Sequence, residues 1–394
     1  MADTVDSFTE TTKRGWGAKL RNAVSGLVIG PLMVVGAILL LTWNEGRSAR
    51  MASALSEGER IVAPVSNTTV DPLFQGKLVY VQGVASTSET LVDDIFGVSS
   101  QALQLRRDVQ MYQWKESEKS STKKEMGGGE STTTEYRYSK EWSASLINSN
   151  DFRRPEGHTN PTMWRYHPDS LLAQNAHIGA LALDPSLVFK IGGEQLLRIQ
   201  DKAQLRPDSI TADIYAYDGG LYVGSDPSKP QIGDLRIKFY QVRPGNVSIV
   251  AGQQDGRLIP FVTSNGTELA LVQAGVHSSA ALFSAARTEN RIMTWLVRLG
   301  GFVLATLGCM VFLSIFVALA DVVPILGSIV GFGTGLISVV VGLIVSALTI
   351  AIAWFAYRPL AAAGLMVAAV VVSIVLIRRR RAAPRTVTPK ARAA

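Results

Sequence analysis

The chain alternates between long apolar segments and one long polar region. Residues 24–43 (VSGLVIGPLMVVGAILLLTW) carry no charge, and residues 295–319, 335–357 and 360–377 are nearly as apolar. A helix needs about 20 apolar residues to cross roughly 30 Å of hydrocarbon. The pattern therefore predicts four membrane-spanning helices, one near the N-terminus and three near the C-terminus.

Aromatic and polar residues mark the predicted membrane borders. Trp43 closes the first span, and the polar residues Asn44, Glu45 and Arg47 follow it directly. Trp and Tyr favour the headgroup level of a bilayer. We expect four residues to be interface anchors: Trp43, Trp295, Trp354 and Tyr357.

A cleaved signal peptide is the alternative interpretation of the first apolar segment. Basic residues precede it, as in a signal peptide. The run is longer than the usual apolar region of about 7 to 15 residues, and TWNEGRS has no clear small-x-small cleavage site. A retained span is the better explanation.

The polar region, residues 44–294, changes to short alternating runs separated by Gly, Pro and Asn. Alternation with period two predicts strands. Helix is expected at residues 193–202 and from 278 into the next span. The predicted strands lie at residues 76–85, 108–114, 134–147, 210–224, 234–242 and 246–254. The fold class is thus a membrane protein with an α-helical four-span bundle and an extracytoplasmic β-rich α+β domain.

Two segments of the polar region interrupt or repeat this pattern. Residues 115–135 (KESEKSSTKKEMGGGESTTTE) are too polar to pack, which predicts a long mobile hairpin tip; contact with a partner is the alternative. DPLFQGKLVYVQG (71–83) and DPSKPQIGDLRIKFYQV (226–242) resemble each other. We therefore consider an internal duplication, with repeats at about 60–150 and 210–275, against a chance match.

Glycines indicate close helix packing. Gly26 and Gly30 form G-x-x-x-G in the first span, and Gly327, Gly331 and Gly335 repeat this spacing. Small residues four apart let helix backbones approach closely. Packing within one bundle and contact between subunits are both open. Because residues 320–334 are apolar but rich in glycine, we expect a connecting or re-entrant segment there.

The formal charge of +7 is concentrated beside the spans, which favours a membrane surface over nucleic acid as partner. Basic residues precede the first span and Arg378, Arg379, Arg380 and Arg381 follow the last. The positive-inside rule then places the N-terminal segment 1–23 and the basic tail 378–394 in the cytoplasm, and the β-rich domain opposite. The four arginines are candidates for anionic lipid contact, with a plain topology anchor as the alternative.

Residues that carry chemistry are scarce. The histidines, at 158, 167, 177 and 277, show no metal-binding spacing, and the single Cys309 lies in an apolar run. GFGTG (331–335) follows no strand and has no lysine, unlike a phosphate-binding loop. We expect no catalytic residue, no cofactor and no metal, so the chain is predicted not to be an enzyme.

Several uncommon residue strings resemble one family. They are NEGR (44–47), LRRDVQMYQW (105–114), YRYSKEWSASLINSNDF (136–152), GHTNP (157–161), GDLR (233–236), LIPF (258–261) and WFAYRPL (354–360). In these the chain resembles the LUMA (transmembrane protein 43) family, four-span proteins with a large domain between the first two spans. The likeness covers nearly the whole length.

The resemblance implies a membrane organiser that self-associates and binds other membrane proteins, in the endoplasmic reticulum and nuclear envelope of animals. The Ala-, Val- and Arg-rich composition looks bacterial, which implies an inner membrane protein with a periplasmic domain. We thus expect a scaffold that forms a homo-oligomer and contacts anionic lipids and unidentified membrane proteins. A small-solute or ion transporter or channel is the alternative, although only Asp321 approaches a span as an acidic group.

Overall fold

The computed structural model describes residues 6–201, 205 and 213–357. These residues form two compact units, which we describe separately. Among the described residues, unit 1 contains 6–22, 50–201, 205, 213–291 and 316–330, and unit 2 contains 23–49, 292–315 and 331–357. Unit 1 therefore contains the β-rich part, and unit 2 contains the apolar helix segments.

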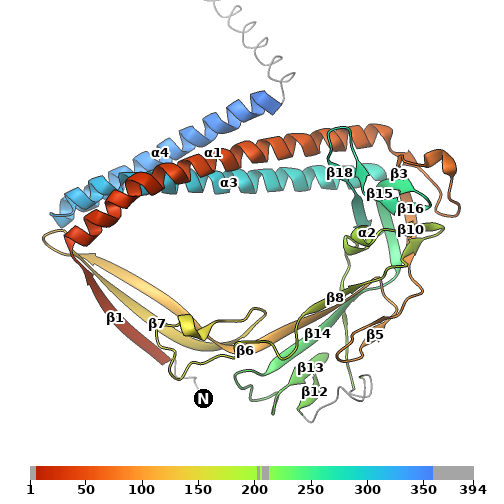
Figure 1. The fold of residues 1–394 in the computed structure, drawn as a ribbon, viewed down its shortest axis with the longest axis horizontal. Coiled ribbons are helices and arrows are strands. Elements are labelled where there is room, and N and C mark those ends of the chain that lie inside the picture. The colour runs from red at the N-terminus through yellow and green to blue at the C-terminus, as the bar shows by residue number, and fades with distance from the viewer. Residues whose placement is uncertain (1–5, 202–204, 206–212, 358–394) are drawn as a thin grey trace, which may run out of the picture. The chain divides into compact units, whose positions relative to one another are not determined.

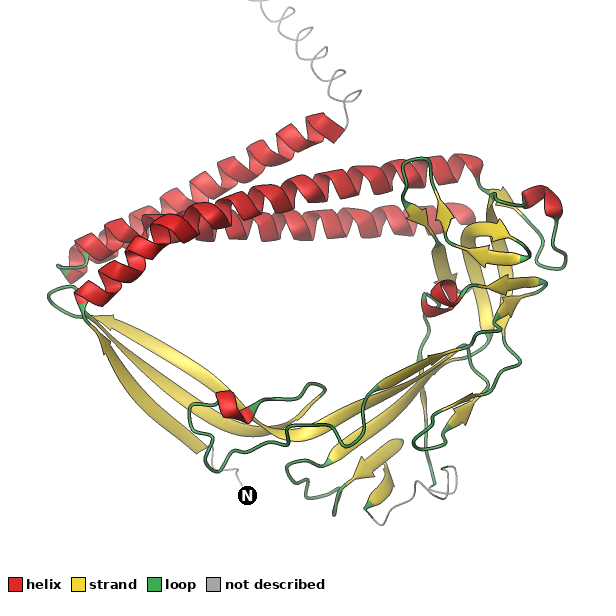
Figure 2. Ribbon diagram, in the orientation of Figure 1, coloured by secondary structure: helices red, strands yellow, loops and turns green. Residues whose placement is uncertain are grey.

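Three long helices carry the apolar segments (Figure 2). They are α1 (Trp16–Ile61), α3 (Ser279–Ala320) and α4 (Pro324–Tyr357), and each is long and apolar enough to cross a membrane. The structure thus supports three candidate spans in the described part of the chain. The fourth predicted span, 360–377, and the basic tail lie outside the described residues.

The expected interruption before the third span is absent. α4 begins at Pro324 and continues through the glycine-rich residues to Tyr357, so the separate segment predicted at 320–334 is wrong for residues 324–334. Proline suits the first turn of a helix because its missing N–H has no partner to lose there. In an apolar environment a helix also satisfies its own backbone, which outweighs the low helix propensity of glycine.

The strands of unit 1 form two large sheets (Figure 1). The first has the order β1 (Asp6–Arg14), β7 (Glu130–Ser143), β6 (Gln104–Lys124), β14 (Leu235–Val242), β13 (Gly220–Val223), β12 (Ile214–Tyr217), with β11 (Gln195–Leu197) on β14 and β8 (Asp169–Leu172) on β6. The second has the order β19 (Leu271–Ala274), β15 (Gly245–Gln254), β16 (Arg257–Ile259), β10 (Leu181–Leu183), β9 (His177–Ile178), β3 (Leu78–Ser86), β2 (Ala63–Pro64).

Smaller elements complete unit 1. Two strand pairs are separate from the large sheets: β4 (Leu91–Val92) with β5 (Ser99–Ser100), and β17 (Phe261–Val262) with β18 (Glu268–Leu269). The short helices are α2 (Pro185–Phe189), η1 (Pro72–Phe74) and η2 (Ser149–Asp151). Asp71 and Asp184 cap η1 and α2 by accepting backbone N–H groups, which explains why these Asp-Pro sequences begin helical turns.

The first sheet buries mainly one face, whereas the second is buried on both faces at β15, because Ile249 and Val250 belong to different hydrophobic cores. Val79, Val81 and Ile249 belong to the core of the second sheet, and Val109, Ile237 and Phe239 to the core of the first. In β3 and β14 these core positions alternate with exposed or half-buried ones, whereas β15 is buried from Val247 to Gln253. Five of the predicted strands match β3, β6, β7, β14 and β15, and residues 210–224 contain the β12–β13 hairpin. Alternating apolar residues were therefore a reliable signal here.

The helix predicted at 193–202 is wrong. Residues Gln195–Leu197 form β11 and pair with Phe239–Gln241 of β14. Tertiary pairing with a buried strand overrides the weak helix preference of this short segment.

The polar stretch 115–135 was predicted to be a long mobile hairpin tip, but most of it forms the regularly paired strands of a β-hairpin. β6 and β7 remain paired from Met111↔Ser143 to Lys124↔Glu130, and the turn is confined to residues 125–129. Cross-strand hydroxyl contacts support the pairing, with Thr122 Oγ1 3.0 Å from Thr132 Oγ1. No apolar alternation marks this stretch, because the outer half of β6 is largely exposed on both faces and residues 130–135 of β7 are half-buried or exposed polar residues.

The N-terminal segment is a strand of the same sheet. β1 pairs antiparallel with β7 from Asp6↔Tyr138 to Arg14↔Glu130, and Thr11 Oγ1 lies 3.3 Å from Thr133 Oγ1. Paired strands share one compartment because backbone hydrogen bonds cannot form across a bilayer. The prediction that residues 1–23 lie in the cytoplasm, opposite the domain 44–294, therefore conflicts with this fold for residues 6–14.

The two similar segments occupy corresponding places in the two sheets. β3 follows the first Asp-Pro and pairs with β15, whereas β14 follows the second and pairs with β6. Asp71 and Asp226 each accept a backbone N–H two residues ahead. The first strand of each segment thus pairs with a strand from the other half, an arrangement expected of a duplicated unit. The duplication stays a prediction.

Candidate functional site

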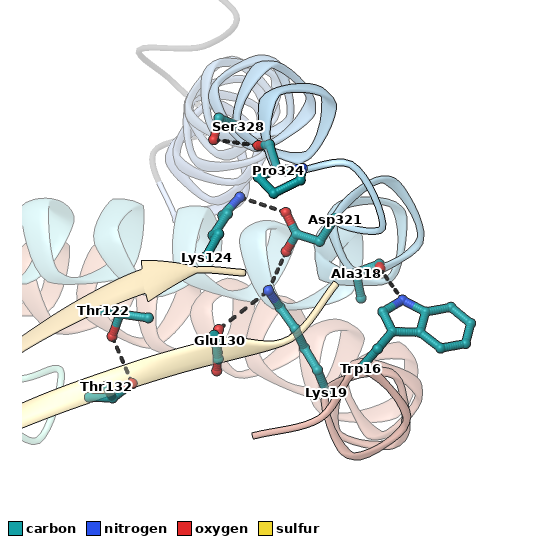
Figure 3. Close-up of polar contacts among 10 residues, drawn as sticks. All are labelled: Trp16, Lys19, Thr122, Lys124, Glu130, Thr132, Ala318, Asp321, Pro324 and Ser328. Atoms are coloured by element: carbon teal, nitrogen blue, oxygen red, sulfur yellow. Dashed lines mark hydrogen bonds and ion pairs between the residues drawn. The ribbon is translucent and has the colours of Figure 1, made fainter. Parts of the chain in front are cut away.

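Asp321 is the centre of a buried cluster of charged residues in unit 1 (Figure 3). It follows α3 directly as its C-terminal cap, and its side chain is 1% exposed. Its carboxylate accepts hydrogen bonds from the ammonium groups of Lys19 in α1 and Lys124 at the end of β6, the latter at 2.6 Å. Lys19 Nζ also lies 3.3 Å from a carboxylate oxygen of Glu130 in β7. We call these four residues the Asp321 cluster.

The tip of the β6–β7 hairpin is shaped to reach this cluster. The backbone N–H of Gly127 donates to the carbonyl of Val322 at 3.1 Å, and Gly128 has φ +83°. A Cβ added at Gly128 would lie 2.4 Å from Cδ1 of Trp16, so a side chain there would collide with the indole. Trp16 Nε1 in turn donates to the carbonyl of Ala318 at 2.8 Å. Glycine at this turn therefore allows the tip, which its polar composition predicted to be mobile, to dock tightly.

The electrostatics of the cluster favour an ionised aspartate. Burial raises the pKa of Asp321, but hydrogen bonds and charge attraction from Lys124 and Lys19 together lower this pKa below its ordinary value. A buried carboxylate with two cationic partners is a structural clamp, because each ammonium satisfies a different oxygen. The cluster joins the first turn of α1, the hairpin tip and the end of α3.

Sequence reasoning identified Asp321 only as an acid near a helix end, and assigned Lys19 to the basic segment before the first span. Nothing in the pattern linked either residue to Lys124 or Glu130, which lie in the stretch predicted to be mobile. The sequence feature that could have indicated the cluster is the glycine-rich turn GGG at 127–129, across which Lys124 and Glu130 are paired. It is visible only once the hairpin is known to be regular.

Unit 2 has its own polar network, which is built from the NEGR string. Arg298 donates to both carboxylate oxygens of Glu45, at 2.7 and 2.9 Å, and Glu45 is 3% exposed. Asn44 Nδ2 donates to the carbonyl of Thr294 at 3.2 Å, and Thr294 Oγ1 donates to Ser48 at 2.9 Å. The polar residues after the first apolar segment therefore link α1 to α3. The sequence pattern predicted only that they mark the exit from the membrane.

The predicted packing glycines differ in what surrounds them. A Cβ at Gly26 would lie 2.5 Å from the carbonyl oxygen of Val311, and one at Gly30 would lie 2.6 Å from that of Gly308. Both thus bring α1 against α3 within one chain. Gly335 has nothing within 4 Å of an added Cβ. Gly327 belongs to unit 1, where its Cβ would overlap Asp321, and Gly331 lies within α4.

The remaining predicted site residues have simple surroundings. Trp43, Trp295 and Tyr357 are 56%, 62% and 42% exposed, and Trp354 is partly buried. Their position at the headgroups stays a prediction. Arg378, Arg379, Arg380 and Arg381 lie outside the described residues. Across residues 6–201 and 213–357, no group of three His, Cys, Asp or Glu side chains is arranged to hold a metal ion.

Long apolar helices joined to a β-rich domain define the class of protein. This chain is an integral membrane protein that has long apolar helices and a β-rich α+β domain. The family model "Transmembrane protein 43" matches residues 111–359. The chain belongs to the transmembrane protein 43 family.

Relatives in animals cover nearly the whole chain. Transmembrane protein 43 of Mus musculus is 31% identical over 366 residues, which are 90% of each chain, and that of Homo sapiens is 30% identical over 361 residues, which are 89% of each. The Drosophila melanogaster homolog is 28% identical over 372 residues, 92% of this chain and 94% of its own. No solved structure matches this chain.

Proposed function

We propose that this chain is a non-enzymatic integral membrane scaffold, which organises protein or lipid assemblies by self-association and through its β-rich domain. The observation that carries the proposal is the three-stranded arm formed by β1, β7 and the outer half of β6. β1 and the outer half of β6 are largely exposed on both faces, whereas most residues of β7 are half-buried and Tyr138 is buried. Apart from Tyr138, which packs on His158 and Phe152, the arm contributes no residue to the described hydrophobic cores, so its exposed surface is available for other molecules.

Self-association has a candidate contact in unit 2. Gly335 leaves α4 open to close approach by a further helix, whereas Gly26 and Gly30 already pack against α3. Small residues at such positions allow dispersion contacts between helix backbones in lipid. Gly335 thus supports the oligomer part of the proposal, and the fourth span predicted at 360–377 belongs to the same proposed bundle.

Size measurement of the full chain in mild detergent tests the proposal. We expect more than one copy per particle by light scattering and by cross-linking, and Gly335→Leu should shift the particle toward the monomer. Gly300→Leu is the matched control, because an added Cβ at this position of α3 also has open space around it. A strict monomer that carries no second protein and no enriched lipid would contradict the scaffold.

A transporter or channel is the second candidate, and one observation favours it. Thr306 Oγ1 in α3 and Ser346 Oγ in α4 are buried and have no hydrogen-bond partner among the described residues. Buried hydroxyls inside apolar helices can mark a polar path. Substrate-dependent flux in liposomes that disappears in Thr306→Val would favour this function.

For localisation we propose a bacterial inner membrane with the β-rich domain in the periplasm. Its support is the composition and the basic residues that flank the first and last apolar segments. Separation of inner and outer membranes by density, followed by immunodetection, tests the first part. The side of the domain is tested by labelling Gln110→Cys, in the Cys309→Ala background, in intact cells with a thiol reagent that does not cross the inner membrane; labelling is expected for a periplasmic domain.

A further inference from the structure

One face of the first sheet gathers aromatic and cationic side chains. The face opposite the core carries Tyr112 of β6, Trp142 of β7, Tyr222 of β13 and Arg236 of β14. Tyr112 is directly opposite Trp142, and Tyr222 is directly opposite Arg236. We call these four residues, together with Gln110 and Lys140, the Trp142 face.

The rings on this face pack against one another side by side. The centroid of the Trp142 ring lies 5.1 Å from that of Tyr112 and 6.1 Å from that of Tyr222. The guanidinium of Arg236 sits over the Trp142 ring at 4.0 Å. Gln110, opposite Arg236 in the register, is exposed. Tyr112, Trp142 and Arg236 are half-buried and Tyr222 is fully buried, so solvent reaches this packed platform mainly at the exposed Gln110 and Lys140.

The charge of the face is incompletely neutralised. Arg106 is paired with Asp108 and Lys238 with Asp218. Within the described part of the chain, neither Arg236 nor Lys140 forms an ion pair, and Arg236 Nε is buried without a hydrogen-bond partner. The ammonium of Lys140 lies over the Trp114 ring at 4.7 Å. Two cations held over indoles thus form no ion pair, and the carboxylate next to this face, Asp234, accepts a hydrogen bond from Tyr222 instead.

We propose that the Trp142 face binds the headgroups of anionic phospholipids. Trp, Tyr and basic residues are the side chains that favour the interface between water and lipid. Each cation near an anionic surface contributes about 1 kcal/mol. Because the chain is anchored in a membrane, lipid headgroups are present at a high effective concentration, which makes weak contacts sufficient. The proposal adds a lipid-binding surface to the scaffold and does not depend on self-association.

The test uses the full chain in nanodiscs with Cys309→Ala and Gln110→Cys, labelled with an environment-sensitive fluorophore. We expect a blue shift in discs that contain phosphatidylglycerol and none in discs of phosphatidylcholine, with the shift reversed by salt. Arg236→Gln and Lys140→Gln should each weaken the apparent lipid interaction about fivefold, which is the effect of losing about 1 kcal/mol.

Arg137→Gln is the matched control, because Arg137 lies on the opposite face of β7 and is paired with Glu135. It should leave the shift unchanged. Three results would overturn the proposal: no shift with phosphatidylglycerol, an equal shift with inorganic phosphate in phosphatidylcholine discs, or a shift that appears only in discs with two copies. Lys140 is exposed, so its variant keeps the test valid if Arg236→Gln fails to fold.

Discussion

At the scale of single residues, the Asp321 cluster makes the sharpest prediction. Asp321→Asn removes the charge that two ammonium groups share, and Lys124→Gln removes one of the two. Hydrogen bonds to charged groups contribute about 1.5 to 3 kcal/mol each. We expect Lys124→Gln to lower the free energy of unfolding by about 2 kcal/mol. The measurement is denaturant-induced unfolding of the chain in detergent, followed by a spectroscopic signal from unit 1.

Lys123→Gln is the matched control for Lys124→Gln. Lys123 is the preceding residue of β6, points to the other face and is exposed. It should change stability by less than about 0.5 kcal/mol. Equal effects of the two variants would show that the hairpin tip depends on total charge and not on the contact with Asp321.

The same aspartate predicts a pH dependence. Its pKa in the folded chain is below the ordinary value of 3.8, so the ionised form is stabilised by folding. The stabilisation is fully present above the unfolded pKa of about 3.9 and is lost as the pH falls through the lower folded pKa. The difference in melting temperature between the natural chain and Asp321→Asn should therefore be constant near neutral pH and shrink below about pH 4. A difference that persists at lower pH would contradict this account.

At the scale of elements, the contact between α1 and α3 depends on glycine. A Cβ at Gly30 would lie 2.6 Å from the carbonyl oxygen of Gly308 and 2.7 Å from the backbone N of Phe312, and backbone atoms cannot move aside cheaply. Gly30→Ala should cost about 1 to 3 kcal/mol through overpacking. Gly36→Ala in the same helix is the control, since its nearest neighbour is a leucine methyl at 4.0 Å. Thermal unfolding in detergent compares them, and equal melting temperatures would refute close packing at Gly30.

The apolar pattern predicted the elements that bury an apolar face and failed for those that do not. Hydropathy located the apolar part of all three described helices, and alternation located β3, β14 and β15, because burial leaves a periodic trace in the residue types. β1 and the outer half of β6 have no such trace. Their strands are specified by Thr and Ser pairs and by neighbouring strands, which are contacts distant in sequence.

The Asp321 cluster was unpredictable for a related reason. Its four residues come from three segments separated by more than a hundred positions, and each is an ordinary charged residue in its local context. The NEGR string was different, because its abrupt polarity after an apolar run was visible at once. The sequence did not predict the role of this string. Glu45 was expected to lie in water, whereas it forms an ion pair with Arg298.

At the scale of the whole molecule, charge and strand pairing give opposite predictions for the N-terminal segment. Basic residues before the first apolar segment favour the cytoplasm, whereas the pairing with β7 places β1 with the hairpin. The hairpin is polar on both faces, and such a sheet is not stable when exposed to hydrocarbon. β1 and the hairpin must therefore share an aqueous or protein-lined environment whenever they are paired.

A pair of cysteines decides between the two predictions. Thr11 and Thr133 are register partners with side-chain oxygens 3.3 Å apart, so Thr11→Cys with Thr133→Cys should form a disulfide in the Cys309→Ala background. We expect the bond in intact membranes as well as in detergent. Thr12→Cys with Thr133→Cys is the control, because neighbouring residues of a strand point to opposite faces. A bond that forms only in detergent would mean that β1 leaves β7 when α1 inserts, and the positive-inside rule would then decide the side of the N-terminus.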